Sequence, residues 1–213
     1  MSKLIIVGAG AFGREVMQWA LQSNGEWDVA GFIDDNLDAL NGIDCPRPIL
    51  GSLDEWQPKS DEVFVVSLGS PKSKKEAVTK LANRGAIFGN IIHNTATLAT
   101  TVKLGCGIIL CPNTVISDSA TIGNHVAINI GSSIGHDVRI GDYSILSSLC
   151  DVTGGVSLGE CTFLGSSVCI IPYRTIGDYA YVSAGSAVMN NVRPNTKVMG
   201  VPAKKFEIKI DEK

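Results

Sequence analysis

The most regular feature of the sequence is a six-residue period in its C-terminal half. From residue 92 to residue 193 every sixth residue is aliphatic, without an insertion, and glycine follows this lead residue in seven hexads. Such a period fits neither the 3.6-residue repeat of a helix nor the alternation of a half-buried strand. It predicts a triangular prism in which three hexads form one coil, and successive coils stack as parallel strands about 4.8 Å apart. The lead residues are Ile92, Leu98, Leu104, Leu110, Ile116, Ile122, Ile128, Ile134, Ile140, Leu146, Val152, Leu158, Leu164, Ile170, Ile176, Val182 and Val188.

The first ninety residues follow a different pattern. An apolar run at residues 4–7 predicts a buried strand, followed by a glycine turn and a helix over residues 12–22. A second strand ends at Asp34 and Asp35, a third ends near Gly69, and a helix with several lysines covers residues 72–83. We therefore expect a Rossmann-like α/β half-domain over residues 1–90, a parallel β-helix over 91–193 and a tail over 194–213.

Composition and charge narrow the classes of partner. The formal net charge is −3 and the chain has no basic run, which disfavours nucleic acid as a ligand. No stretch reaches the ~18 apolar residues of a membrane span. The six cysteines form no CxxC pair and indicate reduced thiols in the cytoplasm. No His, Cys or Asp cluster has the spacing of metal ligands, so we expect no metal and a small-molecule or protein partner.

A glycine motif lies between the first predicted strand and the first helix. Gly8, Gly10 and Gly13 match GxGxxG, and Asp34 follows about twenty residues later, as in dinucleotide sites. A dinucleotide needs two mononucleotide halves, however, and only one fits before the prism begins. The pattern leaves three readings open: a nucleoside diphosphate attached to another group, NAD, or glycines that only allow close packing.

The repeats resemble those of the hexapeptide-repeat acyltransferases, whose left-handed parallel β-helix assembles as a homotrimer, and GVPAKKF at residues 200–206 resembles the closing segment of that superfamily. With GAGAFG, FIDD at 32–35 and SLGS at 67–70, nearly the whole chain resembles the sugar-nucleotide acetyltransferases of the bacillosamine, perosamine and sialic acid type. The chain departs from that family at Ala11 and Phe12, where members often carry Gly and His. The resemblance implies a nucleotide site at Gly10, Ala11, Phe12, Asp34, Asp35 and Gly69.

His136 is the third residue of its hexad and lies beside a corner of the prism. Counting eighteen residues places Asp118 on one side of it and Gly154 on the other, where the missing side chain predicts a groove for a thin ligand. The resemblance makes His136 the general base and Asp137 the acid that supports it. Side chains of adjacent strand residues point in opposite directions, so this pairing requires a bend, and Asp118 is the geometric alternative.

The same resemblance suggests the remaining site residues. It places Asn129 near the substrate and puts acetyl-CoA beside a second set of residues. Ile145 stands where many members have a second histidine, and residues 183–185 replace a glycine run. Of the other histidines, we expect His93 to be structural and His125 to be solvated at a corner. The expected acetyl-CoA residues are Ile145, Gly154, Ser166, Ala184 and Gly185.

The resemblance implies a cytoplasmic, homotrimeric N-acetyltransferase that moves an acetyl group from acetyl-CoA to the amino group of a nucleotide-linked deoxyamino sugar during cell-surface glycan biosynthesis. Two alternatives stay open at this point. The acceptor could be a sugar hydroxyl, as in sialic acid O-acetylation. The chain could also be a catalytically silent sugar-nucleotide sensor or scaffold, which the isoleucine at position 145 makes conceivable.

Overall fold

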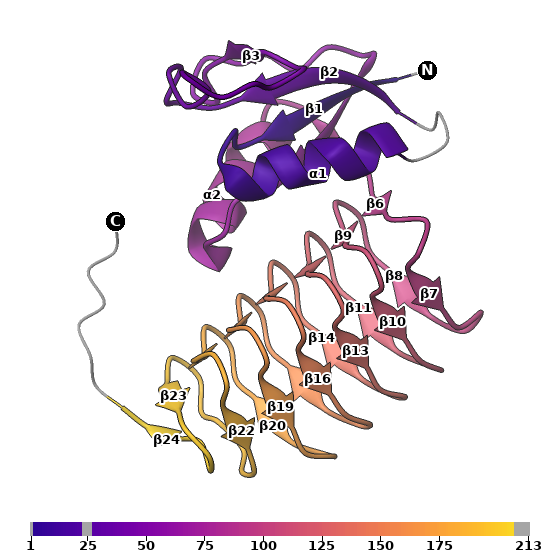
Figure 1. Ribbon diagram of the computed structural model, residues 1–213, viewed down its shortest axis with the longest axis vertical. Coiled ribbons are helices and arrows are strands. Elements are labelled where there is room, and N and C mark those ends of the chain that lie inside the picture. The colour runs from indigo at the N-terminus through magenta and orange to yellow at the C-terminus, as the bar shows by residue number, and fades with distance from the viewer. Residues whose placement is uncertain (1, 23–26, 207–213) are drawn as a thin grey trace.

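The computed structural model describes residues 2–22 and 27–206. An α/β layer built from the N-terminal residues lies across one end of a long stack of β-coils (Figure 1). Neither α-helix of the described residues is long and apolar enough to cross a membrane.

The N-terminal layer is a five-stranded parallel sheet in the order β3-β2-β1-β4-β5. The three predicted strands and both predicted helices are present, together with the short β3 and β5, which the sequence pattern did not indicate. The elements are β1 (Lys3–Val7), α1 (Ala11–Gln22), β2 (Asp28–Ile33), β3 (Ile49–Gly51), β4 (Glu62–Val66), α2 (Pro71–Ala82) and β5 (Ile87–Phe88).

The two helices cover opposite faces of this sheet. Side chains alternate along β1, so this strand contributes apolar residues to both faces. Leu4 and Ile6 pack with the apolar side of α1, in a cluster that also contains β-helix residues. Ile5 and Val7 pack with the apolar side of α2. The N-terminal layer is therefore joined to the coils through α1 on one face of its sheet.

The coils form the predicted prism. Each predicted lead residue is the second residue of a two-residue strand, and each strand from β6 to β19 pairs in parallel with the strand eighteen residues further along, as in Ile116↔Ile134. The strands are β6 (Ile91–Ile92), β7 (Thr97–Leu98), β8 (Lys103–Leu104), β9 (Ile109–Leu110), β10 (Val115–Ile116), β11 (Thr121–Ile122), β12 (Ala127–Ile128), β13 (Ser133–Ile134), β14 (Arg139–Ile140), β15 (Ile145–Leu146), β16 (Asp151–Val152), β17 (Ser157–Leu158), β18 (Phe163–Leu164), β19 (Cys169–Ile170), β20 (Thr175–Ile176), β21 (Tyr181–Val182) and β22 (Ala187–Val188).

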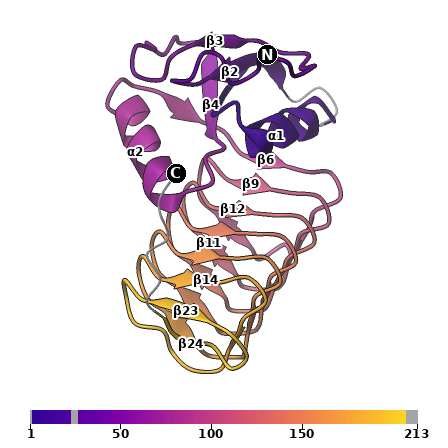
Figure 2. The same ribbon diagram turned by 60° about the vertical axis from the view of Figure 1, so that its left-hand side comes forward.

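Three sheets form the faces of this left-handed parallel β-helix. We number the faces in chain order: the first contains β6, β9, β12, β15, β18 and β21, the second runs from β7 to β22, and the third from β8 to β20. The corners between them are edge 1–2, edge 2–3 and edge 3–1. Figure 2 shows the coils stacked below the N-terminal layer.

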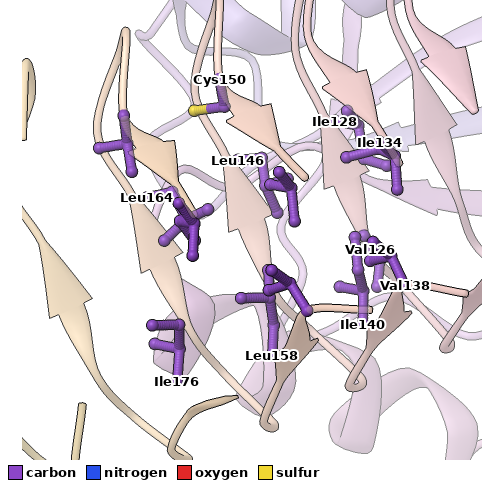
Figure 3. Close-up of a cluster of buried hydrophobic side chains, with 14 of the residues drawn as sticks. Val126, Ile128, Ile134, Val138, Ile140, Leu146, Cys150, Leu158, Leu164 and Ile176 are labelled. Carbon is purple, nitrogen blue, oxygen red and sulfur yellow. The ribbon is translucent and has the colours of Figure 1, made fainter. Parts of the chain in front are cut away.

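The prism is filled by the lead residues and by residues four positions after them. Figure 3 shows this interior, in which Ile128 lies beside Ile134, and Ile140 lies beside Val126 and Val138. Serine and threonine at some of these inner corners are buried but hydrogen-bonded: Ser144 Oγ donates to the carbonyl of Gly159 over 2.9 Å. Removing a buried isoleucine side chain beyond Cβ from such an interior costs about 2–5 kcal/mol.

The last described residues continue the first face. The strand β23 (Lys197–Met199) pairs in parallel with β21, and β24 (Lys204–Lys205) pairs antiparallel with β23. Ala203 packs against the prism interior. The described part of the expected tail, up to residue 206, is therefore part of the β-structure.

Candidate active site

A pocket of about 360 Å³ lies between the N-terminal layer and the first face. It brings together five residues that the sequence placed in the site, from both halves of the chain. Ile145, expected at the cofactor, lines the same pocket as Asn129, expected at the substrate. The lining residues are Ala11, Phe12, Glu15, Gly69, Ala127, Asn129, Ile145, Leu146, Ser147 and Phe163.

Two helices begin at this pocket. Ala11 and Phe12 form the start of α1, and Gly69 precedes Ser70, whose hydroxyl accepts a hydrogen bond from the Ser73 amide at the start of α2. Helix N-termini present free amide groups and the positive end of the helix dipole. The arrangement is therefore suited to a ligand with a negatively charged group between the two helices.

The two predicted aspartates hold the loops behind this pocket. Asp34 accepts hydrogen bonds from the amides of Ala9 (2.7 Å) and Asn36 (2.8 Å). Asp35 accepts from the Ser52 hydroxyl and the Asp54 amide, each at 3.1 Å. Neither lines the pocket, so their observed contacts order the glycine turn and the loop after β3.

The glycines of the turn differ in what surrounds them. A Cβ atom at Gly13 would collide with the carbonyl oxygen of Gly8, whose φ of +98° also favours glycine. At Gly10 a Cβ atom would meet no atom within 4 Å. Close strand-to-helix packing therefore accounts for Gly8 and Gly13, while Gly10 leaves open space at the surface.

The imidazole of His136 is held by its neighbour in the chain. Nδ1 lies 2.8 Å from the Asp137 carboxylate, and both side chains are exposed. The required bend is present because Asp137 has a left-handed φ of +59°. Asp118, the alternative partner, is hydrogen-bonded to the hydroxyls of Thr101 and Ser119. Since a carboxylate only accepts hydrogen bonds, Nδ1 carries a proton, and in the neutral ring Nε2 has the free lone pair.

The imidazole of His136 lies over Gly154. The space over Gly154 holds the imidazole itself, because a Cβ atom there would lie 2.6 Å from Cε1 and closer still to Nε2. The space directly over this glycine is therefore filled by the ring, and a groove for acetyl-CoA beside Gly154 stays a prediction. Eighteen-residue spacing put the two residues side by side correctly, but the ring lies across the neighbouring coil.

Known proteins resemble the chain over almost its full length. Residues 3–81 match the family described as the PglD N-terminal domain. GDP-perosamine N-acetyltransferase of Escherichia coli O157:H7 is 27% identical over 180 residues, which are 80% of each chain. A variant of perosamine N-acetyltransferase from Caulobacter crescentus, solved in complex with CoA and GDP-perosamine, has a TM-score of 0.88 and 28% identity and covers 98% of both chains. WeeI from Acinetobacter baumannii AYE has a TM-score of 0.87 and 25% identity, covering 97% of this chain and all of that one.

The chain has a PglD-type N-terminal domain and is a homologue of the perosamine N-acetyltransferases. Within this chain the predicted site residues lie on different sides of one prism. The pocket opens on the first face, whereas His136 and Gly154 follow β13 and β16 on edge 2–3, opposite that face. The other expected acetyl-CoA residues, Ser166, Ala184 and Gly185, lie on edge 1–2 in the coils beyond Asn129.

His125 is buried, contrary to the expectation of a solvated corner. Its side chain packs edge-on against Phe88 and stacks on Tyr143, with ring centroids 4.7 and 5.4 Å apart. Burial, and secondly the nearby Lys74, lower the pKa of His125 to about 4. The sequence could not show this, because residues far away in the chain cover edge 3–1. His93, as expected, links structural elements: its ring nitrogens contact Thr95 and, at the end of α1, Gln22.

Lys74 is a buried charge-bearing group that the sequence reasoning missed. Its side chain is fully buried, and Nζ donates to the carbonyl of His125 over 3.2 Å. Burial lowers the pKa of Lys74 to about 7. A signal was available: Lys74 precedes Ala77, Val78 and Leu81 at three, four and seven residues, the spacing of the apolar side of a helix.

The cysteines and acidic residues that the structure describes form no metal site. All six cysteines are free, and burial raises the pKa of the Cys150 thiol to about 11. Within residues 2–22 and 27–206, no group of three or more His, Cys, Asp or Glu side chains is arranged to hold a metal ion.

Proposed function

We propose that the protein transfers the acetyl group of acetyl-CoA to the amino group of a nucleotide-linked deoxyamino sugar, with His136 as general base. The observation that carries this proposal is the His136–Asp137 pair on an exposed edge, in which Nδ1 faces the carboxylate and Nε2 of the neutral ring has the free lone pair. The relatives named above support the substrate class, because one is a GDP-perosamine N-acetyltransferase and another was solved with CoA and GDP-perosamine.

The reaction needs little beyond a positioned base, because a thioester is already an activated acyl donor. His136 Nε2 removes a proton from the sugar ammonium group or from the nitrogen as it attacks. The nitrogen bonds to the acetyl carbonyl carbon, the carbon–sulfur bond breaks, and the thiolate of CoA leaves and takes up a proton. The products are an N-acetylated sugar nucleotide and free CoA. Asp137 keeps the imidazole oriented and stabilises its protonated form.

The pocket between the two halves of the chain would hold the sugar nucleotide. Its two helix N-termini suit a diphosphate. Asn129 lies on the β-helix side of the pocket, where its amide can reach the sugar, and Gly69 leaves room on the opposite wall. Because Asp34 and Asp35 already bind loop groups, we propose that they act mainly by shaping the nucleotide-binding loops.

We further propose that the active unit is a homotrimer, because one chain alone does not bring His136 to this pocket. The three faces of the prism differ in character. The first face is covered by the chain's own N-terminal layer. The third presents polar and charged outward residues, among them Lys103, Arg139 and Thr175. The second face is left to meet a neighbouring copy.

Exposed apolar side chains support this use of the second face. They lie on the face itself and along both of its edges, and large exposed apolar groups are typical of interaction surfaces. Around a threefold axis, edge 2–3 of one copy would meet edge 1–2 of the next. His136 would then approach the pocket and the expected acetyl-CoA residues of a neighbour. The side chains are Val115, Ile130, Leu149, Tyr173 and Met189, which are 36–71% exposed.

Thiol release from acetyl-CoA tests the activity. We expect turnover with at least one amino-sugar nucleotide from a panel of GDP-, UDP- and TDP-linked sugars, and none with the matching hydroxyl sugars. Turnover only with hydroxyl sugars would replace this proposal by O-acetylation, and no turnover with either would favour a silent binding protein. Light scattering at micromolar concentration tests the trimer. A cytoplasmic location, also proposed, agrees with the six free thiols.

A further inference from the structure

The helix α2 lies along edge 3–1 of the prism. Residues eighteen positions apart on this edge share a left-handed backbone conformation, with φ values of 54–61°. They belong to consecutive coils, and Figure 2 shows α2 descending beside the stack. These residues are His125, Tyr143, Cys161 and Tyr179.

One ammonium group connects α2 to several of these coils. Lys75 Nζ forms an ion pair with Glu160 and donates to the Tyr179 hydroxyl over 2.9 Å. It also lies 5.7 Å from the ring centroid of Tyr143 and 5.6 Å from that of Tyr179, within the range of cation–π attraction. The Glu160 carboxylate, and secondly the Tyr179 hydroxyl, raise the pKa of Lys75, so this amine stays charged.

Neighbouring contacts hold the same end of the helix. Lys74 donates to the carbonyl of His125, and the Cys161 sulfur lies 4.0 Å from the carbonyl oxygen of Pro71. An isolated surface ion pair contributes little. Here the contacts of residues 71–75 form a row over successive coils, so they orient the first turns of α2 relative to the prism.

The residue two positions before α2, Gly69, is part of the wall of the proposed substrate pocket. Gly69 and Phe163 line both this pocket and a second cavity of about 400 Å³. Ser70, Pro71 and Lys72 line this second cavity. A small displacement of the first turn of α2 therefore changes the shape of both spaces at Gly69.

We propose that Lys75 is a positioning residue for sugar-nucleotide binding: by tying α2 to Glu160 and Tyr179 on the prism, it sets the position of Gly69 and the helix N-terminus at the pocket. The inference rests on the proposed function for the identity of the ligand. It assigns Lys75 no contact with substrate and no part in proton transfer.

Replacing Lys75 with methionine tests the proposal, because methionine keeps much of the side-chain length and removes the charge. Lys75→Met should raise the KM for the amino-sugar nucleotide about fivefold, while kcat and the KM for acetyl-CoA stay within twofold. Lys80→Met is the matched control, since its ion pair with Asp54 stays inside the N-terminal layer. It should leave all three constants within twofold. A Lys75→Met enzyme with an unchanged nucleotide-sugar KM, or with both KM values raised equally, would overturn the proposal.

Glu160→Gln removes the partner from the prism side and should reproduce the effect. If the two residues act through one contact, the Lys75→Met/Glu160→Gln double variant will be no worse than the more impaired single variant. Effects that multiply in the double variant would show that the two side chains act separately, and would contradict the inference.

Amide hydrogen exchange supplies a readout that does not depend on the reaction. Lys75→Met should accelerate exchange at residues 72–76 at least threefold, and Lys80→Met should not. If the parent enzyme turns over no amino-sugar nucleotide, the proposed function fails while this measurement still decides whether Lys75 holds the helix. Unchanged exchange in Lys75→Met would refute that role.

Discussion

The ring of His136 occupies the space that a side chain would need at Gly154, one coil further along the prism. A Cβ atom on Gly154 would lie 2.6 Å from Cε1 of the imidazole, well inside van der Waals contact. On its other side the ring is held by Asp137, 2.8 Å from Nδ1. Backbone on one coil and a carboxylate at the corner thus determine the orientation of the proposed base.

The substitution Gly154→Ala should therefore impair catalysis through His136. The added methyl group cannot be accommodated unless the imidazole turns away, and a displaced base loses much of its contribution of about 10²–10⁴ in kcat. We expect at least a tenfold fall in kcat and a melting temperature near that of the parent. In the background of His136→Ala the same change should cost nothing further, because the ring is gone. A Gly154→Ala enzyme with parental kcat would show that catalysis does not require the His136 ring to lie over Gly154.

Substitution of His136 itself separates catalysis from binding. His136→Ala should lose about 10²–10⁴ in kcat, with small changes in the Kd of either substrate measured by calorimetry. Asp137→Asn should give a smaller loss, because an amide can still bind Nδ1 but stabilises the imidazolium less. Asp118→Asn should have little effect, since that carboxylate binds Thr101 and Ser119. Retention of more than about a third of parental kcat in His136→Ala would make the residue an ordinary corner histidine.

Ligand-induced stabilisation tests the N-terminal pocket. A ligand that binds only the folded state adds about 2.7 kcal/mol at one hundred times its Kd. We expect GDP-, UDP- or TDP-linked sugars to raise the melting temperature, and NAD to leave it unchanged because the layer is too small for two complete mononucleotide halves. The order β3-β2-β1-β4-β5 has five of the six strands of a dinucleotide fold, but β3 and β5 have only three and two residues. Stabilisation by millimolar NADH without any by nucleotide sugars would reverse this assignment.

The prism could be predicted in detail because its rule is local. Each hexad places one aliphatic residue inward, so Ile116 and Ile134 are paired by counting eighteen residues. The same count places Asn129 and His136 in successive hexads and therefore on different edges of the prism. The hexad pattern thus already indicates that one chain does not bring these two residues together. The strands β3 and β5 have only three and two residues, too few for a readable pattern.

Contacts between the two halves could not be predicted. Lys74 and His125 are 51 residues apart in the chain. Nothing in the sequence around either residue indicates that the Lys74 amine will donate to the His125 carbonyl. The burial of His125 follows from the docking of α2 and Phe88, which depends on the tertiary arrangement. The orientation of the His136 ring over Gly154 is a side-chain rotamer, and counting residues does not fix it.

Lys74 makes stability depend on pH in a direction that can be checked. Its pKa is lowered to about 7 in the folded protein, whereas in the unfolded chain it returns to the ordinary value of 10.5. Between these values the unfolded chain binds one more proton than the folded protein, so the free energy of unfolding rises with pH, by up to about 1.4 kcal/mol per unit.

Lys74→Met should remove this contribution and be more stable than the parent at pH 7, because methionine is buried without a charge to desolvate. Urea unfolding of both proteins at pH 7, 8 and 9 and one protein concentration gives the comparison, in which other titrating groups cancel. The stability advantage of Lys74→Met should shrink as the pH rises, and a constant difference across this range would show that Lys74 keeps its ordinary titration in the folded protein.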